Sequence, residues 1–439
     1  MTMRLTVSGT GYLGATHAAC MADLGHEVLG MDVDPAKVAR LNAGEVPFFE
    51  PGLPEVLERA LASGRLRFTT EPAEVAAFGD VHFMCVGTPQ QAGSNAADVS
   101  HIDACVDALA PHLDRPALFV GKSTVPVGTA RRLSERLHLL APAGSDVELA
   151  WNPEFLREGF AVQDTMRPDR LVFGVTSPAA EATLREVYSA AIADGCPVVM
   201  SDLQTAELVK VAANSFLATK ISFINAMAEL CEATGGDVTI LSEALGHDTR
   251  IGNQFLKPGL GFGGGCLPKD IRAFMARAGE LGVDQALTFL REVDAINQRR
   301  RARMVELTHQ ELGGALGDRA IAVLGAAFKP NSDDVRDSPA LDVASILHER
   351  GARVRVYDPK ANENARRRFP NLTYASSVIE ACEGAEAVLH LTEWAEFREL
   401  DPEELGLVVA NRRIVDGRGV LDAARWRRAG WTYRALGQP

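Results

Sequence analysis

The sequence predicts an α/β fold in which two doubly wound parallel-sheet domains are joined by a central helical region. Over about the first 200 residues, apolar β-branched runs alternate with helix-like segments, which is typical of a parallel sheet covered by helices. Long helical stretches follow, and the alternation then resumes. Because 439 residues exceed what one hydrophobic core usually organises, we expect separate domains at 1–200, 201–312 and 313–439.

Six segments of the first domain are expected to be strands. Their apolar residues run continuously instead of alternating with polar ones, which indicates burial on both faces of the sheet. The expected strands are residues 4–8, 27–32, 80–86, 117–122, 147–151 and 170–175.

The central region is expected to be helical. Residues 205–234 contain neither Pro nor Gly and carry apolar side chains at helical spacing on more than one side. We therefore expect this helix to be buried between two domains or two subunits. A second helical run covers about 268–312 with an interruption near Gly282, and Gly313 and Gly314 then mark a boundary.

The last domain echoes the opening of the first. Residues 319–324 and 353–357 are expected to be strands, and Asp358 follows the second of them as Asp32 follows its counterpart. The echo predicts a second doubly wound domain. The loop after its first strand, Gly325-Ala-Ala-Phe-Lys-Pro, lacks a full glycine signature, so this domain is expected to hold something other than a dinucleotide.

The composition excludes some classes of partner. A formal net charge of -13 argues against nucleic acid, whose binding usually rests on a concentrated basic surface. The arginine runs 299–301 and 366–368 are therefore interpreted as solvated helix faces. The seven cysteines stand singly, without CxxC pairs or metal-ligand spacing, so no metal site is expected and most should be small buried hydrophobic side chains.

No membrane segment or signal peptide is expected. The chain enters a strand at residues 3–7 without a basic segment followed by a long apolar run. No apolar run approaches the roughly 20 residues that span a bilayer. We therefore expect a cytoplasmic protein.

A glycine motif in the first domain predicts a dinucleotide site. Gly9-Thr-Gly11-Tyr-Leu-Gly14 stands between the first strand and a helix expected to begin near Tyr12. The first glycine permits the tight turn, the second lets a pyrophosphate approach the backbone, and the third allows close packing, as in a Rossmann-like domain. Asp32 ends the second strand, where a carboxylate accepts from ribose hydroxyls and repels a 2′-phosphate, so NAD is expected rather than NADP.

A second glycine cluster covers residues 258–265 and is followed directly by Cys266. Glycines let the backbone approach a ligand closely, and Cys266 stands where a helix would begin, a position that favours the thiolate. Asp270 lies one helical turn further on, where it could hold water. From these residues alone, a buried cysteine beside a flexible flap is the favoured interpretation.

Three other segments carry polar residues where a site would place them. Lys210 and Asn214 lie four residues apart on one face of a helix that is otherwise apolar there, where a buried lysine needs a function or a partner. Residues 122–129 and 152–159 each follow an expected strand at its carboxyl end, where open parallel sheets bind their ligands.

Taken in order, seven motifs resemble those of the UDP-glucose/GDP-mannose dehydrogenase family, and they span nearly the whole chain. They are GTGYLG (9–14), VGTP (86–89), KSTVPVGT (122–129), NPEFLREG (152–159), ELVKVAANSFLA (207–218), GFGGGCLPKD (261–270) and AFKPNSDDVRDS (327–338). This resemblance, and not composition or periodicity, identifies Cys266 as the expected nucleophile.

The resemblance implies an N-terminal NAD-binding Rossmann domain, a central helical dimerisation region and a C-terminal nucleotide-sugar (UDP)-binding domain. It also implies oxidation of a sugar's primary alcohol to a carboxylate, with two NAD⁺ reduced. Cys266 would trap the aldehyde as a thiohemiacetal, which becomes a thioester and is then hydrolysed. Lys210 would stabilise the developing oxyanion, with Asn214 beside it.

Further roles are implied by the same resemblance. Thr124, Glu158 and Asp270 would position water and move protons, with Glu154 in the same network; the general base stays unassigned among them. The NAD-binding residues would be Gly9, Gly11, Tyr12, Leu13, Gly14, Asp32, Lys37, Val86, Gly87, Thr88, Pro89, Ser123, Thr124, Glu158, Lys269 and Arg336. The substrate-binding residues would be Glu154, Phe155, Leu156, Arg157, Lys210, Asn214, Arg250, Phe255, Lys257, Gly261, Phe262, Gly263, Phe328 and Lys329. A homodimer or higher homo-oligomer is implied, in which Arg250 reaches a partner subunit's site.

Alternatives stay open. Residues 156–159 and 259–264 favour the UDP-glucose branch of the family over the GDP-mannose branch, and the Lys269-Asp270 pair disfavours a UDP-N-acetyl-hexosamine dehydrogenase. A nucleotide-sugar and NAD sensor without catalysis is the alternative from another class. A short-chain dehydrogenase is disfavoured because no tyrosine has a lysine four residues later. The family often has Ser before the cysteine where Gly265 stands, a departure expected to have little consequence.

Overall fold

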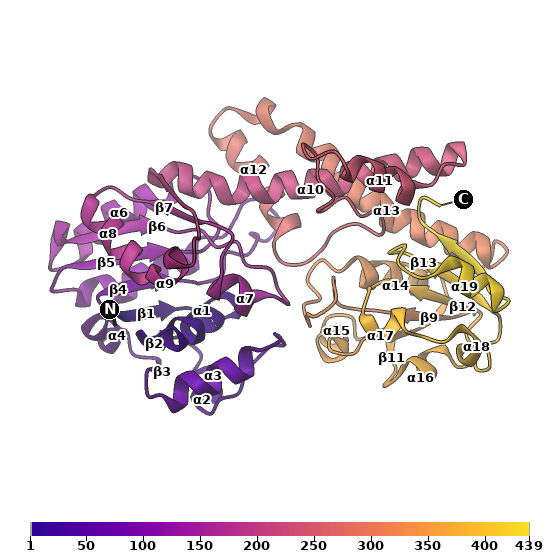
Figure 1. Cartoon of the computed structure of the whole chain (residues 1–439), viewed down its shortest axis with the longest axis horizontal. Helices are drawn as coiled ribbons and strands as arrows, with labels where there is room; N and C mark the ends of the chain where they lie inside the picture. The colour runs from indigo at the N-terminus through magenta and orange to yellow at the C-terminus, as the bar shows by residue number, and fades with distance from the viewer. Residues whose placement is uncertain (1, 439) are drawn as a thin grey trace. The chain divides into compact units, whose positions relative to one another are not determined.

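The computed structural model describes residues 2–438, and the chain divides into two compact units (Figure 1). The first unit comprises the residues up to Ala213 together with Arg272–Gly282. The second comprises Asn214–Ile271 together with the residues from Val283 onward. Each unit holds one sheet of mostly parallel strands, so the predicted fold class is confirmed.

The sheet of the first unit has eight strands in the order β3-β2-β1-β4-β5-β6-β7-β8. They are β1 (Arg4–Ser8), β2 (Glu27–Met31), β3 (Leu66–Thr69), β4 (Val81–Met84), β5 (Ala117–Gly121), β6 (Val147–Trp151), β7 (Leu171–Gly174) and β8 (Val198–Ser201). All six predicted strands are present. Neighbouring strands pair in parallel except β6 and β7, which pair antiparallel at Trp151 and Gly174.

Two strands of this sheet were not predicted, and both lie at its edges. Strand β3 has four residues and includes the charged Arg67, as edge strands often do because one side faces solvent. Strand β8 has three apolar residues followed by Ser201 and lies directly before a long helix. A run that short cannot be distinguished from the start of a helix by periodicity.

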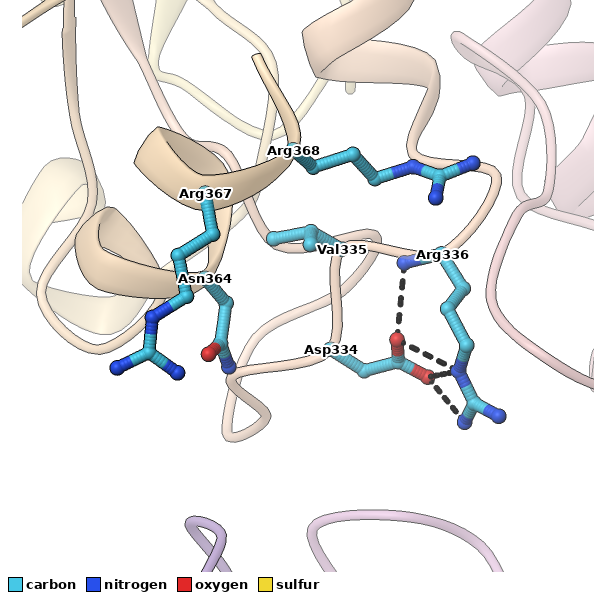
Figure 2. A pocket seen from close by; sticks show the side chains of 6 residues that line it. All are labelled: Asp334, Val335, Arg336, Asn364, Arg367 and Arg368. Atoms are coloured by element: carbon cyan, nitrogen blue, oxygen red, sulfur yellow. Dashed lines mark hydrogen bonds and ion pairs between the residues drawn. The ribbon is translucent and has the colours of Figure 1, made fainter. Parts of the chain in front are cut away.

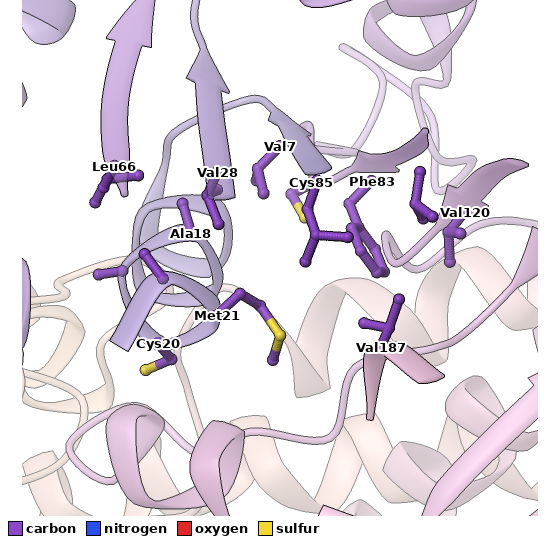
Figure 3. Close-up of a cluster of buried hydrophobic side chains, with 14 of the residues drawn as sticks. Val7, Ala18, Cys20, Met21, Val28, Leu66, Phe83, Cys85, Val120 and Val187 are labelled. Carbon is purple, nitrogen blue, oxygen red and sulfur yellow. The ribbon is translucent and has the colours of Figure 1, made fainter. Parts of the chain in front are cut away.

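Helices cover both faces of the first sheet. They are α1 (Tyr12–Asp23), α2 (Pro35–Asn42), α3 (Leu53–Ala62), α4 (Pro72–Phe78), α5 (Ser100–Leu109), α6 (Thr129–Leu140), α7 (Ala161–Met166), α8 (Pro178–Val187) and α9 (Ser189–Ala193). Successive residues of β2 point to opposite faces, so Val28 packs with α1 and α3, whereas Leu29 packs with α4 and α5. Figure 3 shows the first of these clusters, in which Met21 of α1 lies among strand side chains that include Phe83 and Val120.

The central region is helical, as predicted. It consists of α10 (Leu203–Thr234), α11 (Val238–Gly246), α12 (Leu267–Glu280) and α13 (Phe289–Glu311). The interruption predicted near Gly282 separates α12 from α13 and contains a short 3₁₀ turn at Asp284–Leu287. Among residues 2–438, no helix combines the length and the apolar character needed to cross a membrane.

The second unit contains a six-stranded parallel sheet in the order β11-β10-β9-β12-β13-β14. Its strands are β9 (Ala320–Leu324), β10 (Arg353–Tyr357), β11 (Thr373–Tyr374), β12 (Ala387–His390), β13 (Arg413–Asp416) and β14 (Thr432–Ala435). Its helices are α14 (Pro339–Glu349), α15 (Asn362–Arg368), α16 (Val378–Cys382), α17 (Ala395–Arg398), α18 (Pro402–Leu405) and α19 (Ala423–Arg428). The second doubly wound domain is therefore present, with the strands predicted at 319–324 and 353–357 as its neighbours β9 and β10.

Candidate active site

The turn between β1 and α1 has the geometry of an anion-binding site. Gly9 has a φ of 87°, a conformation that favours glycine, and a Cβ on Gly14 would lie 1.8 Å from the Gly9 carbonyl oxygen. The N-cap of α1 is Gly11, which supplies no side-chain cap, and the first turn carries no acidic residue. A Cβ on Gly11 would meet nothing within 4 Å. The start of α1 therefore has no side-chain cap and leaves space beside Gly11, where the pyrophosphate of a dinucleotide fits.

Asp32 stands at the end of β2 and is ionised. Its Oδ2 accepts hydrogen bonds from Thr10 N at 2.9 Å and from Thr10 Oγ1 at 3.0 Å, and Lys37 Nζ lies 2.8 Å away. Burial alone would raise the pKa of Asp32, but the hydrogen bonds from Lys37, Thr10 and the Asp34 amide hold it below its usual range. A carboxylate at this point accepts from ribose hydroxyls and repels a 2′-phosphate, which favours NAD.

The loops that follow β4 and β5 are joined to each other. The Thr88 hydroxyl donates to the Thr124 carbonyl oxygen at 2.8 Å, and the Ser123 hydroxyl donates to the Val86 carbonyl oxygen at 2.7 Å. These hydrogen bonds thus hold four of the predicted cofactor-binding residues together at the carboxyl edge of the first sheet. That edge is where ligands bind in open α/β sheets.

Lys122 connects the ends of β5 and β6 and was missed as a site residue. It is 3% exposed, and its Nζ lies 3.0 Å from Asn152 Oδ1, 3.1 Å from Glu154 Oε2 and 3.2 Å from the Tyr188 hydroxyl. Burial would raise the pKa of Glu154, but Lys122 holds it below its usual range. A lysine directly after a buried strand, inside the motif 122–129, was the signal that could have identified it.

The ionised Glu154 fixes the loop behind it. Its Oε1 accepts from the backbone amides of Phe155 at 2.7 Å and Leu156 at 2.9 Å. The Phe155 ring then lies under two cations, with Arg170 Cζ 3.8 Å and Lys210 Nζ 5.5 Å from the ring centroid. The loop of residues 152–159 and the Lys210 turn of α10 are therefore in contact within the first unit.

In the second unit, side chains from two helices, α10 and α13, and from one loop hold the glycine cluster before Cys266. Asn225 Oδ1 accepts from Gly259 N at 2.9 Å. Asn297 accepts from Phe262 N at 2.8 Å and donates to its carbonyl oxygen at 2.9 Å. Two arginines complete the set. Arg301 Nη2 donates a hydrogen bond to the Phe262 carbonyl oxygen at 3.2 Å, and Arg418 Nη1 donates one to the Gly261 carbonyl oxygen at 3.0 Å. The cluster is thus a fixed segment, which argues against the flexible flap considered from the sequence.

Cys266 directly precedes α12, which begins at Leu267 as predicted. It is the exposed one of the seven cysteines, five of which are buried. Burial raises the pKa of Cys20, Cys85 and Cys382 to about 12, so these thiols stay protonated. The amino end of a helix favours negative charge on a group placed there, which makes Cys266 the suitable nucleophile.

Asp270 lies one turn after Cys266 and is held from two sides. Its backbone amide donates to the Cys266 carbonyl oxygen at 2.9 Å, and the residue as a whole is 1% exposed. Oδ2 accepts from Asn214 Nδ2 of α10 at 2.6 Å, and Oδ1 pairs with Lys269 Nζ at 2.6 Å. Four predicted site residues, Cys266, Lys269, Asp270 and Asn214, are therefore connected in the second unit.

The loop between β9 and α14 packs on the cysteine loop. A Cβ on Gly264 would lie 2.7 Å from the Phe328 ring, and a Cβ on Gly265 would lie 2.2 Å from Arg336 Cζ. The absence of Ser at 265 thus makes room for a guanidinium beside Cys266. The expectation that this departure has little consequence overlooked the packing of Arg336, because the contact joins segments far apart in the sequence.

A cavity of about 440 Å³ opens beside Arg336 (Figure 2). Its lining includes Arg367 and Arg368 of α15, which the sequence indicated only as part of a solvated helix face. Arg336 is oriented by Asp334, with Nη2 2.6 Å from Oδ2. Three guanidinium groups around one cavity suit an anionic ligand.

The whole chain was then compared with known proteins. Three models of one family match in order: the NAD binding domain over residues 3–192, the central domain over 204–299 and the UDP binding domain over 322–423. The chain belongs to the UDP-glucose/GDP-mannose dehydrogenase family. It is therefore an NAD-dependent dehydrogenase, and the resemblance inferred from its motifs is confirmed.

Relatives of known activity match the family member over its full length. The UDP-glucose 6-dehydrogenase of Rhizobium meliloti is 40% identical, with 100% of both chains covered. The enzyme of the same name from Pseudomonas aeruginosa is 41% identical, covering 100% of this chain and 98% of that protein. The solved UDP-glucose dehydrogenase of Pyrobaculum islandicum superposes with a TM-score of 0.92 at 40% identity, covering 100% of this chain and 98% of that one.

The predicted site residues of this family member are distributed over both units. In the first unit lie Gly9–Gly14, Asp32, Lys37, Val86–Pro89, Ser123, Thr124, Glu154–Glu158 and Lys210. In the second lie Asn214, Arg250, Phe255, Lys257, Gly261–Gly263, Cys266, Lys269, Asp270, Phe328, Lys329 and Arg336. Lys210 and Asn214 stand one turn apart in the same helix, α10. Arg250, Phe255 and Lys257 are exposed, and Arg250 pairs with Asp248 at 2.6 Å.

Arg418 is a second residue of the site that was missed. It follows β13, and besides Gly261 it donates to the Leu391 carbonyl oxygen at 2.7 Å and the Phe328 carbonyl oxygen at 3.2 Å. It therefore joins the cysteine loop to the second sheet. The sequence signal was an arginine between two glycines, Gly417 and Gly419, directly after a buried strand.

Proposed function

We propose that this chain oxidises the primary alcohol of UDP-glucose to the carboxylate of UDP-glucuronate. The proposal is supported above all by the exposed Cys266 at the start of α12, on a clamped loop, in a family member whose full-length relatives are UDP-glucose 6-dehydrogenases. The turn of Gly9–Gly14 would hold NAD⁺, which would supply the hydride acceptor for both oxidation steps.

The covalent step takes place on Cys266. Loss of a hydride and the hydroxyl proton gives the aldehyde, and the Cys266 thiolate adds to its carbonyl carbon to form the oxyanion of a thiohemiacetal. Loss of the second hydride from that carbon gives a thioester. Water then attacks the thioester, the carbon–sulfur bond breaks, and the acid and the thiolate are released.

The neighbouring residues take the roles that their chemistry allows. Lys210 offers positive charge to the oxyanion, and Asn214 stands one turn away on α10. Thr124, Glu158 and Asp270 position water and move protons, and Asp270 is suited to this because Asn214 and Lys269 fix both of its oxygens. The hydrogen bonds of Glu154 to Lys122 and to two backbone amides give that residue a structural part in the same network.

The active form is proposed to be a homodimer or a higher homo-oligomer formed through α10. The face of α10 that carries Phe216, Phe223 and Leu230 is uncovered in the single chain, with Phe216 68% exposed. Contiguous apolar side chains of this size are typical of an interface. In such a dimer, the exposed Arg250 would reach the partner subunit's site. None of the seven cysteines, all of which lie within residues 2–438, forms a disulfide, which fits the reducing cytoplasm, where we place the activity.

The decisive measurement is the number of NADH formed per nucleotide-sugar consumed, with UDP-glucose and GDP-mannose run in parallel. We expect two NADH per UDP-glucose and a loss of kcat of roughly 10³-fold or more in Cys266→Ser. One NADH with release of a free aldehyde, or full activity without the thiol, would contradict the covalent route. Preference for GDP-mannose would change the substrate, and binding of both ligands without NADH would indicate a sensor.

A further inference from the structure

Helix α6 begins without a cap of its own. Its N-cap is Gly128, which has a φ of 96° and no side chain to accept from the first amides. Thr129, the first helical residue, directs its hydroxyl to the Pro126 carbonyl oxygen at 2.6 Å. The amides at the start of α6 must therefore find acceptors from another part of the chain, because buried amides without partners are costly.

Glu207 of α10 supplies those acceptors. Its Oε2 accepts from Gly128 N at 2.7 Å, and its Oε1 accepts from Ala130 N at 2.6 Å. Glu207 as a whole is 2% exposed. One carboxylate, buried in the first unit, thus caps a helix that lies 77 residues away in the sequence.

The capped segment is the end of the loop that carries Ser123 and Thr124. Two hydrogen bonds fix the other end of that loop: the Ser123 hydroxyl donates to the Val86 carbonyl oxygen, and the Thr88 hydroxyl donates to the Thr124 carbonyl oxygen. Glu207 therefore completes the restraint on the loop from the side of α10. It stands three residues before Lys210, on the same side of the helix.

We propose that Glu207 is a positioning residue that couples the Lys210 turn of α10 to the Ser123–Thr124 loop, and that it does so only while its carboxylate is ionised. The proposal rests on the function proposed above, in which Lys210 and Thr124 act on the same substrate. An ionised carboxylate accepts both amide hydrogen bonds. A protonated one has a hydroxyl in place of one acceptor, so one amide loses its partner and the start of α6 loosens.

The surroundings of Glu207 place this change near neutral pH. Burial raises the pKa of Glu207 to about 7, although the amides of Ala130 and Gly128 and the charge of Arg277 lower it. Arg277 of α12 is the charged group that faces the carboxylate. Its Nε donates to the Val127 carbonyl oxygen at 3.0 Å, and its Nη1 pairs with Glu280 at 2.7 Å.

The first test compares kcat and KM of the full-length enzyme with Glu207→Gln over pH 5.5 to 9, with UDP-glucose and NAD⁺. Gln has the same shape and cannot ionise. We expect kcat of the wild type to fall below about pH 7, and kcat of the variant at pH 8 to be roughly 10- to 100-fold lower, without that fall. KM for UDP-glucose should change less than about twofold, because the residue does not contact the substrate. Wild-type kcat in the variant, or an unchanged fall below pH 7, overturns the proposal.

Two further variants keep the test decisive. Glu181→Gln, at a half-buried glutamate on α8 that pairs with Arg185, is the matched control and should retain the wild-type profile. Arg277→Gln removes the cation that lowers the pKa of Glu207, so the fall in kcat should move to higher pH even if Glu207→Gln does not fold. A fall that stays in place in Arg277→Gln contradicts the role of Glu207.

Hydrogen exchange of the amides of Gly128 and Ala130 tests the coupling without turnover. After correction for the intrinsic pH dependence of exchange, we expect wild-type protection at pH 8 that decreases at pH 6, and low protection at both values in Glu207→Gln. Protection that is independent of pH overturns the proposal. Because this measurement needs no substrate, it separates failure of the coupling from failure of the proposed reaction.

Discussion

The first and second sheets of this chain share one architecture and differ at the point where a dinucleotide would bind. Leaving aside β7 and β8, both have the order 3-2-1-4-5-6. In each, the first two strands pair in parallel over five positions, and an aspartate follows the second strand. These are Asp32 after β2 and Asp358 after β10.

The two aspartates have different partners. Asp32 is bound in part by Lys37, a side chain that is 29% exposed and can move aside for a ligand. Asp358 accepts from the backbone amides of Ala326, Ala327, Lys360 and Ala361 and from the Trp394 indole, all at 2.8 to 3.0 Å. Its oxygens are committed to holding its own loop, so no ribose hydroxyl can use them.

The helices that follow the first strands differ in the same way. The amino end of α1 has no side-chain cap, whereas Ser338 caps α14 by accepting from Leu341 N, and Pro339 occupies its first position. An anion can use the free amides of α1 but finds those of α14 already bonded or missing. The strand order alone therefore does not make a dinucleotide site; unused donors and acceptors at the turn do.

The largest expected effect concerns the buried ammonium group of Lys122, which joins the ends of two strands of the first sheet. At the carboxyl edge of that sheet, Lys122 pairs with Glu154, whereas at the same edge of the second sheet His390 pairs with Asp416. Lys122→Met leaves the Glu154 carboxylate without its cation, which should lower the free energy of unfolding by about 3–5 kcal/mol. Urea unfolding measures the loss.

A double-mutant cycle provides the control for Lys122. Lys122→Met/Glu154→Gln removes both charges and should recover a large part of the stability. If the double variant is as unstable as Lys122→Met, the ion pair is not what distinguishes this edge from that of the second sheet.

The next effect tests the open turn directly. Gly11→Val should weaken NADH binding roughly 100-fold, or about 2.7 kcal/mol, because the side chain occupies the space where the pyrophosphate approaches the backbone. The melting temperature should hardly change, since a Cβ at this position meets nothing within 4 Å. Fluorescence titration of NADH measures the affinity.

The control for Gly11→Val is a glycine that is equally unhindered but lies away from the turn. Gly279→Ala in α12 also places its Cβ in open space and should bind NADH as the wild type does. Equal binding by Gly11→Val and the wild type would show that the uncapped end of α1 is not the anion site.

Most of the fold could be predicted because short stretches of sequence determine its strands and turns. Continuous apolar runs identified the six inner strands, and the echo at 319–324 and 353–357 identified the second domain. The motif glycines were found because glycine-dependent turns are local as well, whereas Cys266 was identified as the expected nucleophile by the family resemblance. The edge strand β3 escaped because its four residues include a charge.

The parts that could not be predicted depend on contacts between distant segments. Asn297 and Arg418 hold the cysteine loop from 35 and 157 residues away. In the sequence, Glu207 is one polar residue near the start of a helix, and nothing nearby shows that it caps α6. Burial and partners of this kind arise only when the chain is folded.

The third prediction concerns the loop after β13, which carries Arg418. Asp416 accepts from the amides of Arg418, Gly419, Val420 and Leu421 at 2.8 to 2.9 Å. Burial would raise the pKa of Asp416, but its hydrogen bond to His390 and these amides lower it from 3.8 to about 2. Because the folded pKa is depressed, the stabilisation is present above pH 3.8 and is lost as the pH falls through 2.

That stabilisation is worth about 2 kcal/mol. Unfolding followed by tryptophan fluorescence reports on it, since Trp394, Trp426 and Trp431 all lie in the second unit. The advantage of the wild type over Asp416→Asn should be constant from pH 7 to 5 and shrink between pH 4 and 2, while Asp284→Asn, at an exposed position, should follow the wild type. An advantage that does not depend on pH would assign the loop's stability to packing.

The smallest effect tests Gly265, where the family resemblance led us to expect a serine. In Gly265→Ser, the added Cβ would lie 2.2 Å from Arg336 Cζ, so the guanidinium must move. Arg336 has a flexible side chain anchored to Asp334, so the free energy of unfolding should change by less than about 1 kcal/mol. If Arg336 contacts NAD⁺, its displacement should raise KM for NAD⁺ severalfold and leave KM for UDP-glucose unchanged. If Arg336→Ala raises KM for NAD⁺ by the same factor, and the double variant Gly265→Ser/Arg336→Ala raises it no further, then Gly265 acts through Arg336. Additive effects of the two substitutions would show instead that Gly265 acts on Cys266 itself.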